Sequence, residues 1–149
     1  MTDAEIADHV RIRAVLENYF SAIDQRDLAF LLTCFTEDAE AIYNAGTPDA
    51  RPSQGGAKMC GMLVKRAALF ASSNHSVSNI TIRIEGDRAA STTFAVVHAN
   101  GGDHIVVRGL RYDDELVKQG EAWKIATRRH SPLWQHEVPA SGIGMPKLQ

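Results

Sequence analysis

The chain has few of the residues and patterns that mark metal, nucleotide or membrane proteins. Its 149 residues include two cysteines, Cys34 and Cys60, whose spacing fits no metal site. It contains no glycine-rich nucleotide loop, Walker motif or HExxH motif. No apolar run approaches the ~20 residues that a membrane span needs, and the stretch MTDAEIADHVRIRA is too charged for a signal peptide. We therefore expect a cytoplasmic protein with no metal, no cofactor and no membrane partner.

Neither sign of charge is in large excess. The chain has 18 acidic and 16 basic residues, a net charge of −2, and the two signs are interspersed. A nucleic-acid surface needs a basic excess, so we expect no nucleic-acid partner. The length fits one domain, residues 1–149, and the composition beyond about residue 136 predicts a loose C-terminal tail.

The first half of the chain has the periodicity of helices. Thr2 and Glu5 have the spacing of a capping box, which predicts a helix start. Asp27 can cap a short helix over LAFLLTCF, and a third helix is predicted over about residues 55–71. AEAIY predicts a strand that ends at Tyr43, and NAGTPDARPSQGG predicts a loop. The buried stripe of the first helix is Ile12, Val15, Leu16, Tyr19, Phe20 and Ile23.

The second half has the pattern of strands. Four runs, SVSNITIRI, RAASTTFAVVHA, HIVVRGLRYDDELV and AWKIATRRH, are separated by the turns EGD, NGGD and KQGE. Strands joined by short hairpins form an antiparallel meander. Helices followed by such strands predict an α+β fold.

Two polar residues stand out against this pattern. Asp24 continues a row formed by Leu16 and Phe20 at four-residue spacing, so its carboxylate extends an apolar helix face and must reach solvent or a partner. His75 opens a strand and carries an imidazole that titrates near neutrality. Each also has an ordinary structural interpretation, as an exposed helix end and as a structural histidine.

Further candidates come from the parity of the strands. A sheet face that mixes apolar side chains with His, Arg and Tyr is typical of a pocket. The candidates are Phe94, Val96 and His98 on one strand, Arg108 and Tyr112 on the next, and Ala126 and Arg128 on the last. The alternative is an amphipathic strand with its polar residues in solvent.

The order of these segments resembles a known family. YFSAIDQRD, FTEDAEAIY, NHSVSNITI, GLRYDDEL and WKIATRR together resemble the SnoaL-like branch of the nuclear transport factor two-like superfamily, over about residues 6–132. The resemblance implies a cone-shaped α+β barrel, in which a curved, mainly antiparallel sheet wraps three N-terminal helices. It also implies a homodimer or homotrimer. An apolar outer strip at Val107 and Val117 favours the same assembly.

Two members, scytalone dehydratase and hexachlorocyclohexane dehydrochlorinase, resemble the chain in the spacing of their site residues. Both pair a helix aspartate with a histidine at a strand start, matched here by Asp24 and His75. The first adds a second histidine and a tyrosine, matched by His98 and Tyr43, and the second adds an arginine, matched by Arg128. The catalytic lysine of the second has no counterpart. The substrate-binding candidates are Tyr19, Phe20, Phe94, Val96, Arg108 and Tyr112.

We therefore expect a cofactor-independent lyase, with dehydration as the first choice. His75 would remove a proton from a small, hydrophobic, cyclic substrate. His98 or Tyr43 would donate to the departing oxygen, and Arg128 or Arg108 would stabilise negative charge.

Other functions fit parts of the same pattern. A ketosteroid-isomerase-like enzyme would use the same base and no leaving group. A ligand-binding module, or a subunit like the small β-subunits of ring-hydroxylating dioxygenases, would need no Asp–His pair. Asp24, His75 and His98 also match the residue types of an iron-binding triad.

Overall fold

The chain opens on a long helix whose two ends are fixed by local hydrogen bonds. The computed structural model describes residues 1–141 and places α1 at Asp3–Gln25. The predicted capping box is present: Thr2 Oγ1 accepts from the Glu5 N–H at 3.2 Å, and the Thr2 N–H donates to Glu5 Oε2 at 2.6 Å. Arg26 caps the C-terminal end of the helix with a left-handed φ of 56°, and its N–H donates to the carbonyl oxygens of Ala22 and Ile23.

Two shorter helices follow. α2 (Leu28–Thr33) is capped as predicted by Asp27, whose carboxylate accepts the Phe30 N–H at 2.9 Å. α3 (Gly56–Ala67) ends before residue 71, the predicted end. No helix within residues 1–141 is long and apolar enough to cross a membrane.

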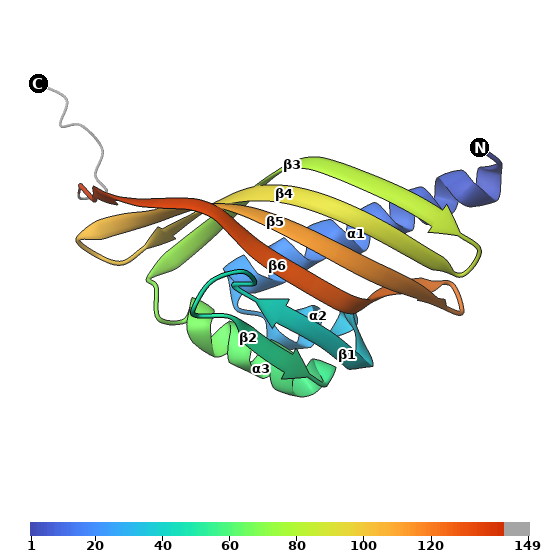
Figure 1. The fold of residues 1–149 in the computed structure, drawn as a ribbon, viewed down its shortest axis with the longest axis horizontal. Coiled ribbons are helices and arrows are strands. Elements are labelled where there is room, and N and C mark those ends of the chain that lie inside the picture. Colours follow the sequence, from blue (N-terminus) through green and yellow to red (C-terminus); the bar gives the residue numbers. More distant parts are fainter. Residues whose placement is uncertain (142–149) are drawn as a thin grey trace, which may run out of the picture.

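Six strands form one curved sheet, and the helices lie against one of its faces (Figure 1). The strands are β1 (Phe35–Tyr43), β2 (Arg51–Gln54), β3 (Ser72–Glu85), β4 (Arg88–Asn100), β5 (His104–Gln119) and β6 (Ala122–Pro139). Their order is β2-β1-β6-β5-β4-β3; β1 and β6 pair in parallel, and the other neighbours pair antiparallel. The predicted α+β fold with a curved, mainly antiparallel sheet is confirmed. The helices lie inside its curve.

Two stretches predicted to be irregular are strands. β2 lies within the predicted loop and pairs with the end of β1, where its Pro52 is tolerated because β2 is the edge strand. β6 continues through residues 136–139, where His136 pairs with Val107, so the predicted loose tail begins too early. β6 is longer than the predicted strand AWKIATRRH because it pairs with β5 over nearly its whole length. The rest of that prediction, residues 142–149, lies outside the described residues.

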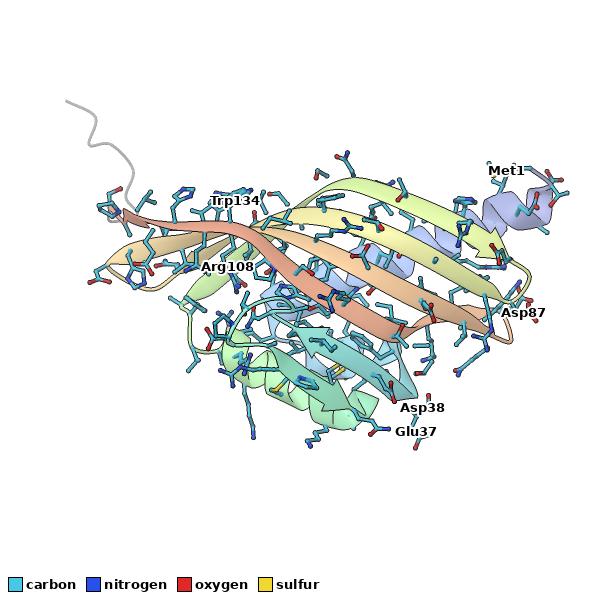
Figure 2. All side chains as sticks on the ribbon, in the orientation of Figure 1. Met1, Glu37, Asp38, Asp87, Arg108 and Trp134 are labelled. Carbon is cyan, nitrogen blue, oxygen red and sulfur yellow. The ribbon has the colours of Figure 1, made fainter. Side chains whose placement is uncertain are left out.

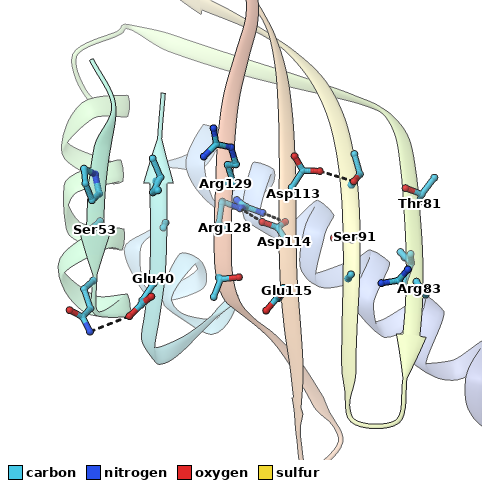
Figure 3. Close-up of a pocket in the computed structure, with 18 of the residues that line it drawn as sticks. Glu40, Ser53, Thr81, Arg83, Ser91, Asp113, Asp114, Glu115, Arg128 and Arg129 are labelled. Carbon is cyan, nitrogen blue, oxygen red and sulfur yellow. Dashed lines mark hydrogen bonds and ion pairs between the residues drawn. The ribbon is translucent and has the colours of Figure 1, made fainter. Parts of the chain in front are cut away.

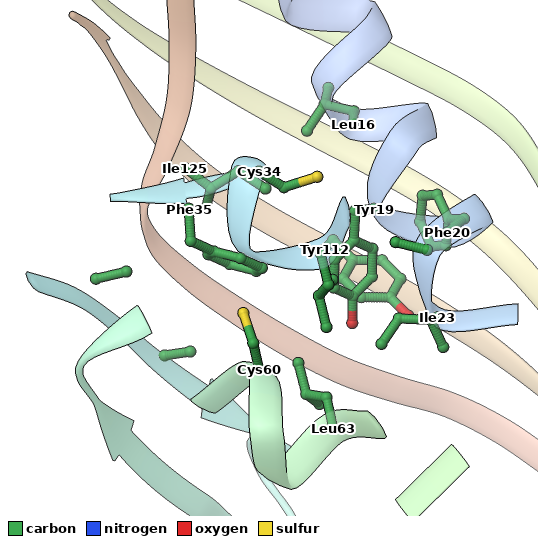
Figure 4. Packing of buried hydrophobic residues seen from close by; sticks show 14 of the residues in the cluster. Leu16, Tyr19, Phe20, Ile23, Cys34, Phe35, Cys60, Leu63, Tyr112 and Ile125 are labelled. Atoms are coloured by element: carbon green, nitrogen blue, oxygen red, sulfur yellow. The ribbon is translucent and has the colours of Figure 1, made fainter. Parts of the chain in front are cut away.

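The core fills the space between the helices and the inner face of the sheet (Figure 4). Tyr19 and Phe20 of α1 meet Tyr112 of β5 edge to face, at ring-centroid distances of 5.8 and 5.1 Å. Such contacts stabilise a core beyond the area they bury. Tyr19 and Tyr112 also form part of the wall of the cavity described below.

One ion pair lies wholly inside the protein. Arg128 of β6 donates through Nε and Nη2 to the two carboxylate oxygens of Asp114 on β5, both at 2.7 Å, and both side chains are 0% exposed (Figure 3). The guanidinium carbon also lies 4.0 Å from the Tyr19 ring centroid and 4.7 Å from that of Tyr112. Burial opposes the charge, but Asp114 outweighs it and holds the pKa of Arg128 well above its ordinary value.

Breaking this pair from one side should destabilise the fold strongly. Asp114→Leu leaves a buried, unpaired guanidinium, and we expect the free energy of unfolding to fall by about 3–5 kcal/mol. The double variant Arg128→Met/Asp114→Leu removes both charges and should recover most of that loss. Urea unfolding of the two variants and the wild type provides the comparison. A loss below about 1 kcal/mol in Asp114→Leu would contradict the assignment.

Candidate active site

A cavity of about 340 Å³ opens between the end of α1, α3 and the inner face of the sheet. Ligand pockets in proteins have about this size or more, ≈300–1,000 Å³. Much of its wall is apolar, and the following polar or ionisable residues also line it: Tyr19, Tyr43, Asn44, Arg66, Ser73, His75, Arg108, Tyr112, His130 and Gln135.

The end of α1 meets the start of β3 through Asp24 and His75. Asp24 Oδ1 lies 2.7 Å from His75 Nδ1, so the predicted contact is present. The carboxylate accepts, so Nδ1 carries the proton and Nε2 is left with a free lone pair. The His75 side chain is 9% exposed and lines the cavity. This tautomer suits a general base.

Two further donors hold the Asp24 carboxylate. Ser73 Oγ donates to Oδ1 at 2.8 Å, and the backbone N–H of His75 donates to Oδ2 at 2.7 Å. Burial alone would raise the pKa of Asp24, but these hydrogen bonds and the His75 ring outweigh it and lower that pKa. The carboxylate is therefore ionised at neutral pH and oriented before any ligand binds.

A second histidine in the cavity, His130 of β6, was missed by the sequence prediction. Its Nδ1 accepts the backbone N–H of Asn44 at 3.0 Å. Burial lowers the pKa of His130 to about 3, and the nearby charges of Arg108, Arg128 and His75 act in the same direction. The ring is therefore neutral at pH 7. Its parity with Arg128 along WKIATRRH was the signal that could have identified it.

The tyrosines of the wall form a buried polar cluster. The hydroxyls of Tyr19 and Tyr43 lie 3.1 Å apart, and Tyr112 packs against the His130 ring with centroids 5.0 Å apart. Burial raises the pKa of Tyr43 and of Tyr112 well above the ordinary value, so both phenols keep their protons. They can donate hydrogen bonds to a ligand and do not serve as bases.

Two predicted site residues lie behind the wall. Arg128 does not line the cavity; it is held by Asp114 and lies over the face of the Tyr19 ring. Phe20 packs against His75 with ring centroids 5.3 Å apart and is 3% exposed. Both residues therefore shape the site through their neighbours.

Three predicted site residues of β4 lie on the opposite face of the sheet. Along β4, exposed or half-buried residues alternate with buried ones: His98 is exposed, and Phe94 and Val96 are half-buried. The buried residues between and after them, Val97 and Ala99, line the cavity. The three do share one face, as predicted, but it is the outer one. Apolar residues occur at both parities in TFAVVHA, so alternation could not select the inner face.

The same placement separates the residues of the alternative iron triad. His75 lines the cavity and contacts Asp24, whereas His98 lies on the outer face of the sheet. No group of three His, Cys, Asp or Glu side chains within residues 1–141 is arranged to hold a metal ion.

A broader hollow of about 1050 Å³ lies on the outer face of the sheet (Figure 3). Its residues are mostly charged or hydroxylated, such as Arg83, Asp113, Glu115 and Arg129, and none is a histidine or tyrosine. Acidic and basic side chains from different strands are mixed across this hollow, so it has no cluster of candidate catalytic groups. The smaller inner cavity is therefore the candidate active site.

The fold and this site define a member of the SnoaL-like proteins. A model of the SnoaL-like domain family matches residues 4–129, and the chain belongs to that family. An uncharacterized protein of Mycobacterium tuberculosis is 33% identical over 136 residues, which are 89% of this chain and 90% of that protein.

Solved structures share the fold at lower identity. A candidate scytalone dehydratase from Novosphingobium aromaticivorans has a TM-score of 0.80 and 21% identity, covering 99% of this chain and 100% of that one. A hexachlorocyclohexane dehydrochlorinase of LinA type 3, from Novosphingobium barchaimii, has a TM-score of 0.76 and 15% identity, covering 97% of each chain. These likenesses confirm the expected nuclear transport factor two-like fold.

The low pKa of His130 should make the protein less stable in mild acid. An unfolded histidine binds a proton near pH 6.5, whereas the folded ring resists one until about pH 3. Between those values the unfolded state binds more protons, so stability falls as pH falls, by up to about 1.4 kcal/mol per pH unit. Urea unfolding between pH 6.5 and 4.5 should show a shallower pH dependence in His130→Gln than in the wild type. Equal slopes would contradict the assignment.

Proposed function

We propose that the protein is a cofactor-independent lyase in which His75 is the general base. The observation that carries the proposal is the 2.7 Å contact between Asp24 Oδ1 and His75 Nδ1 at the wall of a 340 Å³ cavity. Asp24 fixes the tautomer and stabilises the imidazolium that forms when Nε2 takes a proton. Asp24 does not itself take the proton.

The reaction proposed is an elimination, with loss of water as the first choice. His75 removes a proton from carbon, the C–H electron pair forms the new double bond, and the bond to the leaving oxygen breaks. The proton on His75 then neutralises that oxygen, so water departs and the base is regenerated. His98 has no part in this scheme, because it lies on the outer face. Tyr43 remains as a hydroxyl donor within the cavity.

The size and lining of the cavity favour a small hydrophobic, cyclic substrate. Leu63, Phe70, Val97, Val106 and Leu110 contribute apolar wall. A dry wall strengthens the few polar contacts that a substrate makes. The similarity in fold to a dehydrochlorinase and to a candidate scytalone dehydratase supports the same reaction class.

An isomerase that moves a proton within a ketone would use the same base, and a binding module would use none. Product analysis separates the first alternative, since isomerisation releases no leaving group. Co-purification with a Rieske-containing subunit would favour the second.

The Asp24–His75 pair should control proton removal from carbon. The assay is exchange of the α-protons of 1-indanone and 2-tetralone in D₂O, followed by NMR. Replacing an orienting acid costs ~10⁴-fold in a serine protease. We expect Asp24→Asn and His75→Ala each to lose at least about 10²-fold, and the double variant to be little worse than either.

His98→Ala is the matched control for that experiment. Its imidazole is exposed on the outer face, so exchange should be unchanged. Full activity in both Asp24→Asn and His75→Ala would sink the lyase proposal together with its isomerase variant, and would favour a binding module.

We also propose that the protein assembles as a homodimer or homotrimer. Val107 is 7% exposed, flanked across the strands by His98 and His136, so it gives little of the predicted apolar strip. Leu133 and Trp134 of β6 are 50% and 48% exposed and offer an apolar surface near the end of the sheet that also carries Arg108 (Figure 2).

Light scattering at micromolar concentration should therefore give two or three times the 16.3 kDa chain mass. Trp134→Glu places a charge on that surface and should shift the mass toward the monomer. A wild-type monomer would rule the assembly out.

A further inference from the structure

The inner cavity holds a second polar centre besides the Asp24–His75 pair, built around Asn44. The backbone N–H of Asn44 donates to His130 Nδ1 at 3.0 Å, and its side-chain Oδ1 accepts from Arg108 Nη2 at 3.0 Å. One residue thus sets the orientation of both a histidine and an arginine. Both of these line the cavity together with His75.

The tautomer of His130 follows from this contact. Since Nδ1 accepts a hydrogen bond, it carries no proton, and the neutral ring must be protonated at Nε2. Nε2–H has no hydrogen-bond partner among residues 1–141, although His130 is 6% exposed. A buried imidazole N–H that faces a cavity is available to an acceptor on a ligand.

Arg108 adds a positive charge beside this donor. Its guanidinium makes no ion pair with any described carboxylate, and its one hydrogen bond goes to the neutral amide of Asn44. Its Nε is buried without a partner among the described residues. An uncompensated cation and a neutral N–H donor together favour an oxygen that carries, or gains, negative charge.

We propose that His130 and Arg108 form a carbonyl-oxygen site, and that the substrate class is a cyclic ketone with an acidic C–H next to its carbonyl. This inference rests on the proposed function, because it supplies the electron sink for the proton that His75 removes. A carboxylate is the less suitable substrate, because its α-proton is far less acidic than that of a ketone.

The chemistry balances without any further reactant. As His75 Nε2 takes the α-proton, the C–H electron pair becomes a carbon–carbon double bond and the carbonyl π pair moves onto oxygen. His130 Nε2–H donates a hydrogen bond to that oxygen without transferring its proton. When the β C–O bond breaks, the carbonyl re-forms, and the leaving oxygen takes the proton from His75 and departs as water.

The groups around His130 support this role. Arg108 and Tyr112 face it from β5, Tyr43 from β1, Arg128 from its own strand, and His75 from β3. Two of these are arginines, and its pKa is lowered to about 3, mainly by burial. The ring thus remains a neutral donor at neutral pH.

The test uses 2-tetralone carrying ¹³C at the carbonyl, observed by infrared difference spectroscopy. Bound to the wild type, its carbonyl band should move to lower frequency, since a hydrogen bond weakens the C=O bond. The shift should persist in Asp24→Asn and in His98→Phe, which makes the same replacement on the outer face. It should be smaller in His130→Phe, where Arg108 remains, and α-proton exchange should fall about 10²–10³-fold, as when one oxyanion donor is removed.

The outcomes separate the two proposals. Exchange that depends on His75 but not on His130, with an unchanged carbonyl band in His130→Phe, overturns the carbonyl site and leaves the lyase proposal standing. A band shift that depends on His130, without exchange that depends on His75, supports the carbonyl site and overturns the lyase proposal. Failure of 1-indanone and 2-tetralone to bind, or tighter binding of 2-naphthoate than of either ketone, overturns the assignment of a ketone.

A measurement on the wild type covers the case in which His130→Phe does not fold. In ¹⁵N NMR spectra, His130 should be the neutral Nε2–H tautomer at pH 5 and at pH 8, and its Nε2 resonance should shift when 2-tetralone is added. An Nδ1–H tautomer, a charged ring at pH 5, or an Nε2 resonance that ignores the ketone would each overturn the proposal.

Discussion

The carboxylate of Asp24 joins the end of the first helix to the outermost strand of the sheet. β3 is an edge strand, so on one side it has only the helix to hold it in place. Asp24 accepts from Ser73, from the His75 ring and from the His75 backbone, each within 2.8 Å. An ionised carboxylate with three donors orients strongly, because charge-assisted hydrogen bonds are about twice as strong as neutral ones. The part of the cavity wall formed by Ser73 and His75, and the tautomer of its base, therefore depend on the same group.

Behind the cavity, the Arg128–Asp114 pair plays a different part. Arg128 does not line the cavity, yet its guanidinium lies over the rings of Tyr19 and Tyr112, which do line it. A buried ion pair contributes little net stability compared with apolar residues of the same volume. What it provides is a fixed positive charge near the phenols and near His130, where it helps to keep the imidazole neutral. A pocket built from hydrocarbon alone would lack this field.

The sequence was sufficient for those features that depend on local pattern. The capping box at Thr2, the cap at Asp27 and the hairpin between β3 and β4 follow from residue spacing, and all are present. The position of Asp24 on an apolar helix face, with the resemblance to a family, was enough to predict its contact with His75. Parity failed at His98, because both faces of its strand carry apolar residues.

His130 shows the opposite limit. Its neutral state and free Nε2–H depend on Asn44, 86 positions away in the chain, and on burial that no local window contains. The short strand β2 was hidden for a related reason, since RPSQ has little strand propensity and is ordered by pairing with β1. The state of His130 and the presence of β2 thus depend on contacts between distant segments, and the composition of each segment alone could not predict them.

The clamp on His130 has an evolutionary consequence. It is made by the main chain of Asn44 at the start of a long connection, and any residue other than proline can supply the same N–H. The left-handed φ of 55° there favours asparagine or glycine, but the proton on His130 would be placed alike by either. Related chains could therefore exchange the side chain that holds Arg108, and with it their preference for charge on the ligand, while the hydrogen-bond donor stays in place.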